Sequence, residues 1–149
     1  MIRLDAGLTY AQAGEAVIAA RTHDVFAHQP ERVLSLENTE GVHKMRVATR
    51  RLRAALEIFA DAFPRKRLAA ALSDVKLLAA ALGERRDLDV QIELLSSLSG
   101  QARRDERKAI DALIADLRHQ QHIANEQLDA ALEHAREANL ERRLARLAK

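Results

Sequence analysis

The sequence predicts an all-α protein, an antiparallel helical bundle that ends in a long C-terminal helix. Its 149 residues include only 5 Gly and 2 Pro, and Ala, Leu, Arg and Glu are frequent, as is typical of helical proteins. Apolar residues recur at helical spacing along almost the whole chain. A chain of this length can bury one core, so we expect residues 1–149 to form a single domain.

Two prolines divide the first part of the chain. The first helix is predicted from about Thr9 to His28, and residues 31–39 add another turn or two. The second helix is predicted over residues 42–62. It ends before Pro64, because the residue preceding a proline avoids the α region.

Two glycines divide the next part. A third helix is predicted over residues 67–82, with Gly83 in the left-handed conformation that commonly follows a helix. Asp87 or a neighbour then caps a short fourth helix, which reaches about Leu98 before Gly100.

Residues 102–149 contain no Gly or Pro and follow a 4-3 apolar alternation typical of packed helices. One helix of this length would extend about 70 Å, more than a small bundle can cover. It either bends near Gln120–His122 or overhangs and packs on a partner chain, and we favour self-association. Two ordinary helices joined by an unmarked turn are the alternative.

A basic segment follows Gly41. At 100° per residue, four of its basic residues fall within roughly 80° of arc, opposite apolar residues such as Met45 and Leu52. We call these four the basic row: His43, Arg46, Arg50 and Arg53. No acidic residue interrupts the segment before Glu57, so we expect its arginines to lack carboxylate partners within the helix.

Charge is segregated along the chain, although the formal net charge is only +2. Residues 43–86 hold 11 Lys and Arg against 4 Asp and Glu, a net charge of +7, so the remainder carries −5. Because the potential at a site steers its ligands, this local positive field predicts an anionic partner.

Arginine binds phosphate oxygens through a planar fork and stays charged at physiological pH. A row repeated every turn, about 5.4 Å apart, suits a polyanion better than one isolated phosphate. Further cations on or beside the third helix could face the same groove: Arg65, Lys66, Arg67, Lys76, Arg85 and Arg86. The alternative to an anion site is an ordinary charged helix face in contact with solvent. For His43, the alternative to phosphate binding is a neutral histidine that is hydrogen-bonded at the start of the helix.

Catalytic and metal-binding patterns are weak. The spacings of the 6 His residues form no HExxH-type pair, and no Ser-His-Asp set or Gly-rich phosphate loop occurs. Asp87 and Asp89 resemble acid/base candidates, but capping and arginine positioning explain them better. We therefore expect a protein that is not an enzyme and uses no cofactor or metal. A metal-dependent phosphatase or phosphotransferase accessory is an alternative.

Nucleic acid is the rival partner, because it is also a phosphate polymer. Aromatic residues make up only 3% of the chain, so platforms for base stacking are missing. We expect at most non-specific binding of nucleic acid.

Two segments together resemble the CHAD family of helical domains: Val42-His43-Lys44-Met45-Arg46-Val47-Ala48-Thr49-Arg50-Arg51-Leu52-Arg53 and Leu82-Gly83-Glu84-Arg85-Arg86-Asp87-Leu88-Asp89-Val90. The resemblance implies a helical bundle that binds inorganic polyphosphate in a basic groove. By position, it implies that the phosphate path is lined by His43, Lys44, Arg46, Arg50, Arg51, Arg53, Arg85 and Arg86, with Asp87 orienting them. Arg67 and Lys76 are added on charge and helix placement.

Members of this family usually resemble two similar helical halves, whereas this chain contains one copy of the motif pair. It therefore resembles one half of a CHAD domain, and we expect a homodimer whose two basic rows share one groove. The chain has no cysteine, no apolar N-terminal leader pattern and no apolar run long enough for a membrane span. These features favour a cytoplasmic protein, which could associate with polyphosphate granules.

Overall fold

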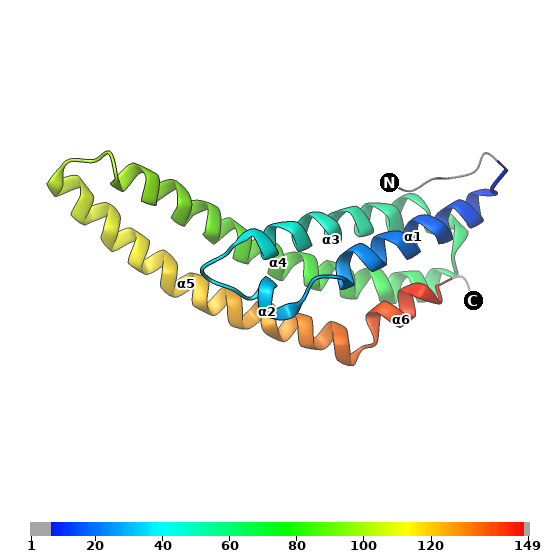
Figure 1. Ribbon diagram of the computed structural model, residues 1–149. Coiled ribbons are helices and arrows are strands. Elements are labelled where there is room, and N and C mark those ends of the chain that lie inside the picture. Colours follow the sequence, from blue (N-terminus) through cyan, green and yellow to red (C-terminus); the bar gives the residue numbers. More distant parts are fainter. Residues whose placement is uncertain (1–6, 148–149) are drawn as a thin grey trace.

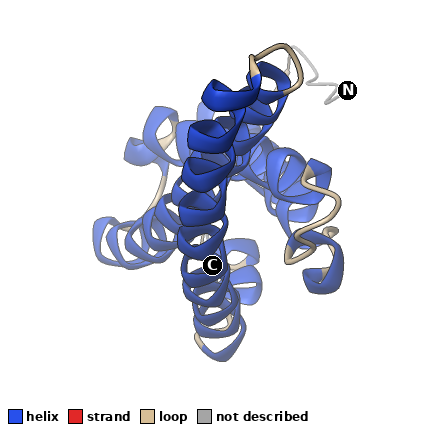
Figure 2. Ribbon diagram, turned by 90° about the vertical axis from the view of Figure 1, so that its left-hand side faces the viewer, coloured by secondary structure: helices blue, strands red, loops and turns tan. Residues whose placement is uncertain are grey.

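The computed structural model describes residues 7–147, in which every regular element is helical, and the all-α prediction is confirmed (Figure 2). The elements in chain order are α1 (Tyr10–Phe26), α2 (Pro30–Val33), α3 (Glu40–Ile58), the 3-10 helix η1 (Ala60–Ala62), α4 (Arg65–Ser99), α5 (Arg104–Glu137) and α6 (Leu140–Ala145).

The core lies where α1, α3 and α6 pack with the first half of α4 and the last part of α5 (Figure 1). On α3, the buried residues occupy one face: Val42, Met45, Ala48, Thr49, Leu52, Ala55 and Leu56. Burial of this apolar face fixes the rotation of the helix, and it leaves the opposite face in solvent.

The α4–α5 hairpin extends beyond the rest of the molecule. At 1.5 Å per residue, the 35 residues of α4 span about 52 Å, whereas the 19 residues of α3 span about 28 Å. The excess forms a two-helix projection, residues 90–118, which we call the arm (Figure 1). The expected overhang is therefore present, but it is a hairpin rather than a single helix.

The predicted helix end at Gly83 is wrong, because α4 runs without a break from Arg65 to Ser99. An isolated glycine inside a helix costs only about 1 kcal/mol relative to alanine. The buried residues on either side, Leu82 and Arg85, pack against the bundle and outweigh that cost.

The C-terminal segment contains one long helix and one short helix. α5 continues without a break through Gln120–His122, and Gln121 is buried there. The break comes at Asn139, whose φ of 49° and ψ of 42° place it in the left-handed region that asparagine tolerates. This turn directs α6 back onto the bundle, where Leu140 and Leu144 are buried.

The start of α3 lies against α2. A Cβ at Gly41 would clash with the carbonyl oxygen of Arg32, so glycine permits this close approach of the two backbones. The approach holds the segment between α2 and α3 beside the first turn of α3, where the basic row begins.

Candidate anion-binding face

The basic row lies on the solvent side of α3. Arg50 and Arg53 are exposed, while His43 and Arg46 are half-buried at the edge of the packed face. The spacing of these residues therefore predicted their common face.

The arginines at the centre of this face form no ion pair with the described part of the chain. Within residues 7–147, no carboxylate oxygen lies within 4.0 Å of the guanidinium nitrogens of Arg46, Arg50 or Arg51. The expectation fails for Arg53, because its Nε donates to Glu57 Oε1 at 3.0 Å, four residues further along the helix.

A groove of about 500 Å³ lies beside the row, between the end of α1 and the start of α3. It is lined by Asp24, His28, Glu40, His43, Lys44, Val47, Ala48 and Arg51. Lys44 Nζ lies 3.6 Å from Glu40 Oε1, so this cation of the groove has a weak ion pair. The groove thus presents cations from α3 and a histidine from the segment that follows α1.

His28 is sensitive to the charge in this groove. Burial lowers its pKa, the nearby Lys44 ammonium lowers it further, and Asp24 opposes the shift. An anion bound in the groove would favour the protonated imidazole, because it would offset both the burial and the cation.

Arg85, on α4, is completely buried, at 0% exposed. Its Nε donates to Asp89 Oδ1 at 3.0 Å, its Nη1 to Asn125 Oδ1 at 2.7 Å and its Nη2 to the Ser35 carbonyl oxygen at 3.0 Å. Asn125 in turn donates to the Leu34 carbonyl oxygen at 2.9 Å. Arg85 therefore joins α4, α5 and the α2–α3 segment, and it does not line a phosphate path.

The carboxylate that holds Arg85 is Asp89 rather than Asp87. Burial raises the pKa of Asp89, against the hydrogen bonds from Gln121 and Arg85, and burial lowers the pKa of Arg85. Asp87 is exposed in the middle of α4, so it caps no helix and is not placed to orient the arginines. The two carboxylates therefore do not form an acid/base pair.

Arg86, on α4, lies beside the start of α3. Its Nη1 is 3.4 Å from Glu93 Oε1 and 3.5 Å from Thr39 Oγ1, and Thr39 Oγ1 donates to Glu93 at 3.0 Å. Thr39 directly precedes α3, so its hydroxyl is used by this cluster instead of capping the helix. Arg86 thus links α4 to the beginning of the row and is itself partly neutralised.

A family model described as CHAD domain matches residues 16–149. The chain belongs to the CHAD domain family. A CHAD domain is a binding module rather than a catalytic domain, and the family is associated with polyphosphate binding in general. Searches of the curated proteins and of the solved structures gave no match.

In this CHAD domain, two of the expected contacts lie on opposite sides of α4. Lys76 follows Arg67 by nine positions, or about half a turn of rotation at 100° per residue. Both are exposed, but Arg67 lines a groove with α6 to which α3 contributes no residue. Arg67 and the basic row therefore do not share one groove.

His28 and Asp24 were missed by the sequence reading. They precede Pro30 and reach the row only because α1 packs against α3. The position of His28 at the end of a helix was visible, but its neighbour across the bundle was not.

Among the described residues, no group of three or more His, Asp or Glu side chains could hold a metal ion. The helices within residues 7–147 include none with the length and apolar character of a membrane span.

Proposed function

We propose that this CHAD domain binds inorganic polyphosphate along the exposed face of α3. The observation that carries the proposal is the set of three arginines, Arg46, Arg50 and Arg51, that have no carboxylate within 4.0 Å among residues 7–147. Guanidinium groups normally occur beside acidic groups on exposed helices, so an unpaired set indicates an external anion. Family membership supports phosphate polymers as that anion.

The contacts divide by their surroundings. His43, Lys44, Arg46, Arg50, Arg51 and Arg53 form the binding face, and Lys76 is an exposed contact on the neighbouring helix. Arg86, at the start of α3, would contribute once the anion competes with Glu93. Arg85 is buried and hydrogen-bonded to Asp89, Asn125 and Ser35, so we assign it no phosphate contact.

Titration of long-chain polyphosphate into the protein at fixed salt tests this proposal. Arg46→Glu/Arg50→Glu should weaken binding by more than about a hundredfold, because each charge-assisted hydrogen bond contributes roughly 1.5–3 kcal/mol. Helicity and melting temperature should stay the same, since both changed side chains lie on the solvent side of α3. Wild-type affinity should fall steeply with salt, as it does when a protein displaces counterions from a phosphate polymer.

The matched control is Arg104→Glu/Arg118→Glu, which changes the net charge equally on α5. Because both residues lie in residues 90–118, light scattering checks that this variant keeps the oligomeric state of the wild type. The control should keep polyphosphate affinity within about threefold of the wild type, because surface charges far from a ligand are screened. Equal losses of polyphosphate affinity in both variants would mean that binding depends only on overall charge, and would contradict the proposal. DNA or RNA that displaced polyphosphate at equal phosphate concentration would instead favour nucleic acid.

We also propose that a second copy of the chain packs on the arm. On the side of α4 that faces away from α5, Val90, Leu94 and Leu98 are 45%, 59% and 48% exposed at successive turns. Residues 90–118 contain five basic and five acidic residues, so two arms can meet without net charge repulsion. The second copy would also supply the second helical half that the family resemblance implies.

Light scattering at micromolar concentration measures this association. The wild type should have the mass of a dimer, and Leu94→Gln/Leu98→Gln should have the mass of a monomer, because the substitutions remove the exposed apolar stripe. A wild-type monomer that still binds polyphosphate tightly would contradict the dimer.

A further inference from the structure

We infer that the groove between α4 and α6 is a second anion site, one that takes an oligophosphate separately from the face of α3. The groove has a volume of about 890 Å³. Five of its seven lining residues are cationic: Lys66, Arg67, Arg142, Arg143 and Arg146, with Ala70 and Leu147 as the others. Two segments about 75 residues apart in the sequence thus bring their cations to one concave surface.

Only one of these five cations has an acidic partner among residues 7–147. Arg143 Nη1 lies 2.5 Å from Asp74 Oδ2, and Asp74 is also 3.4 Å from His134. Within that part of the chain, no carboxylate lies within 4.0 Å of the charged nitrogens of Lys66, Arg67, Arg142 or Arg146. A groove with this excess of positive charge favours an anion that carries several negative charges over a monovalent one.

The first turn of α4 adds an independent observation that favours anion binding. Residues 65–67 are all basic, the turn has no acidic residue, and no side chain caps the helix, which follows Pro64. Cations at a helix N-terminus oppose the helix dipole, and the first N–H groups have no partner within the helix. A phosphate at this position would satisfy both, since helix N-termini and arginine forks each bind phosphate oxygens.

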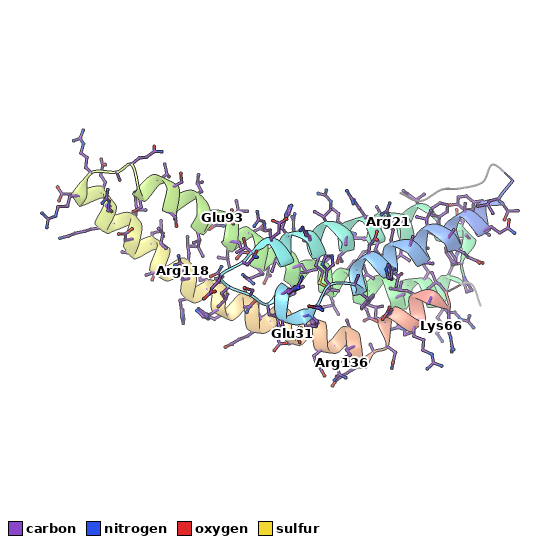
Figure 3. The ribbon with its side chains drawn as sticks, in the orientation of Figure 1. Arg21, Glu31, Lys66, Glu93, Arg118 and Arg136 are labelled. Carbon is purple, nitrogen blue, oxygen red and sulfur yellow. The ribbon has the colours of Figure 1, made fainter. Side chains whose placement is uncertain are left out.

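α6 is held firmly enough to present its arginines. The left-handed turn at Asn139 reverses the chain, and Leu140, Leu144 and Leu147 are buried in the core. The Arg143–Asp74 ion pair then joins α6 to α4. Arg142 and Arg146, one turn apart, remain exposed beside Lys66, which Figure 3 shows next to α6.

The groove lies apart from the face of α3. None of its lining residues belongs to α3, and α3 and α6 run along opposite edges of the bundle (Figure 1). The same chemistry could come from a free short oligophosphate or from the end of a long polyphosphate chain. Both sources present several phosphate groups within the length of the groove.

Calorimetric titration with inorganic tripolyphosphate tests the site on the whole chain. Arg142→Glu/Arg146→Glu should weaken tripolyphosphate binding by more than about tenfold, given the strength of charge-assisted hydrogen bonds. Arg104→Glu/Arg118→Glu has the same change in charge, lies outside both anion sites and should leave the affinity within about threefold. Lys66→Gln/Arg67→Gln is a second variant, which leaves α6 intact and should also lose at least about tenfold.

An unchanged tripolyphosphate affinity in both groove variants would overturn the inference, as would an equal loss in the control Arg104→Glu/Arg118→Glu. Failure of the proposed function would differ, because the variant of α3 would then keep its affinity for long-chain polyphosphate. Adding saturating tripolyphosphate before the long chain distinguishes the two sources. Unchanged long-chain affinity supports a separate oligophosphate site. Competition that is lost in Arg142→Glu/Arg146→Glu supports a groove that holds the end of the polymer, and competition that persists in that variant occurs at the face of α3.

Discussion

Arg85 in α4 and Arg50 in α3 carry the same guanidinium group in opposite surroundings. Arg85 is 0% exposed and donates to Asp89, Asn125 and the Ser35 carbonyl oxygen, so the fold itself supplies its counter-charge. Arg50 is exposed and has no carboxylate within 4.0 Å among residues 7–147. The difference separates cations that hold the molecule together from cations that are available to a ligand. Both kinds lie within the segments that carry the family resemblance.

The largest expected effect on stability comes from replacing Arg85, the buried arginine of this comparison. Arg85→Met should lower the free energy of unfolding by about 3–5 kcal/mol, because it leaves Asp89 buried without its ion-pair partner. Arg50→Met is the matched control. It should change stability by less than about 0.5 kcal/mol, as surface substitutions usually do. Urea unfolding followed by circular dichroism measures both variants.

The double variant Arg85→Met/Asp89→Leu sharpens this result. Replacing both charges with apolar groups should recover much of the lost stability, since the cost of the single change is mainly that of an unpaired buried charge. If Arg85→Met were as stable as the wild type, Arg85 would not be the structural support described above. If the double variant is stable, its affinity for polyphosphate shows whether the hydrogen bonds of Arg85 and Asp89 also affect binding at the face of α3.

A smaller effect is expected at His28, whose surroundings are intermediate between those of Arg85 and Arg50. Because the pKa of His28 is lowered in the folded protein, the unfolded chain binds the proton more readily. The stability of the free protein should therefore fall as the pH drops below about 6.5. Polyphosphate affinity should move in the other direction and rise on acidification, because a bound polyanion favours the protonated imidazole.

Measuring the free energy of unfolding and the polyphosphate affinity between pH 5 and 8 checks whether the two change in opposite directions. His28→Gln should flatten both profiles, because it removes the imidazole that takes up the proton. His43→Gln is the control for the other histidine in the groove. A His28→Gln variant with the wild-type pH dependence in both profiles would show that His28 does not sense the anion.

Residue spacing was sufficient where one helix determines its own structure. It placed α3 and its two faces, because burial of residues such as Leu52 fixes the rotation of the basic row. It also placed the end of that region before Pro64. Local rules failed at Gly83, because a single glycine does not end a helix whose neighbours pack on both sides of it. At Asn139, the left-handed tendency of asparagine was present in the sequence but was not used.

Residue spacing was insufficient where function depends on contacts between distant segments. Nothing around Arg85 in the sequence shows that Asn125, 40 residues later, accepts its hydrogen bond and makes it structural. Likewise, Arg67 shares a groove with Arg142 only because the chain reverses at Asn139. Charge alone cannot separate a ligand-binding arginine from a buried one, because both carry the same group at similar helical positions.

The arm gives the molecule a gradient of rigidity. At its root, Arg85 and Asp89 bond to α5 and to the α2–α3 segment, whereas near its tip Ser99 Oγ donates to Asp111 at 2.7 Å between two helices that project into solvent. Local opening costs least where few buried contacts are lost. In the monomeric variant Leu94→Gln/Leu98→Gln, amide protons should therefore exchange faster around Gly100 than around Arg85, so the hairpin would fray from its free end while its base stays closed.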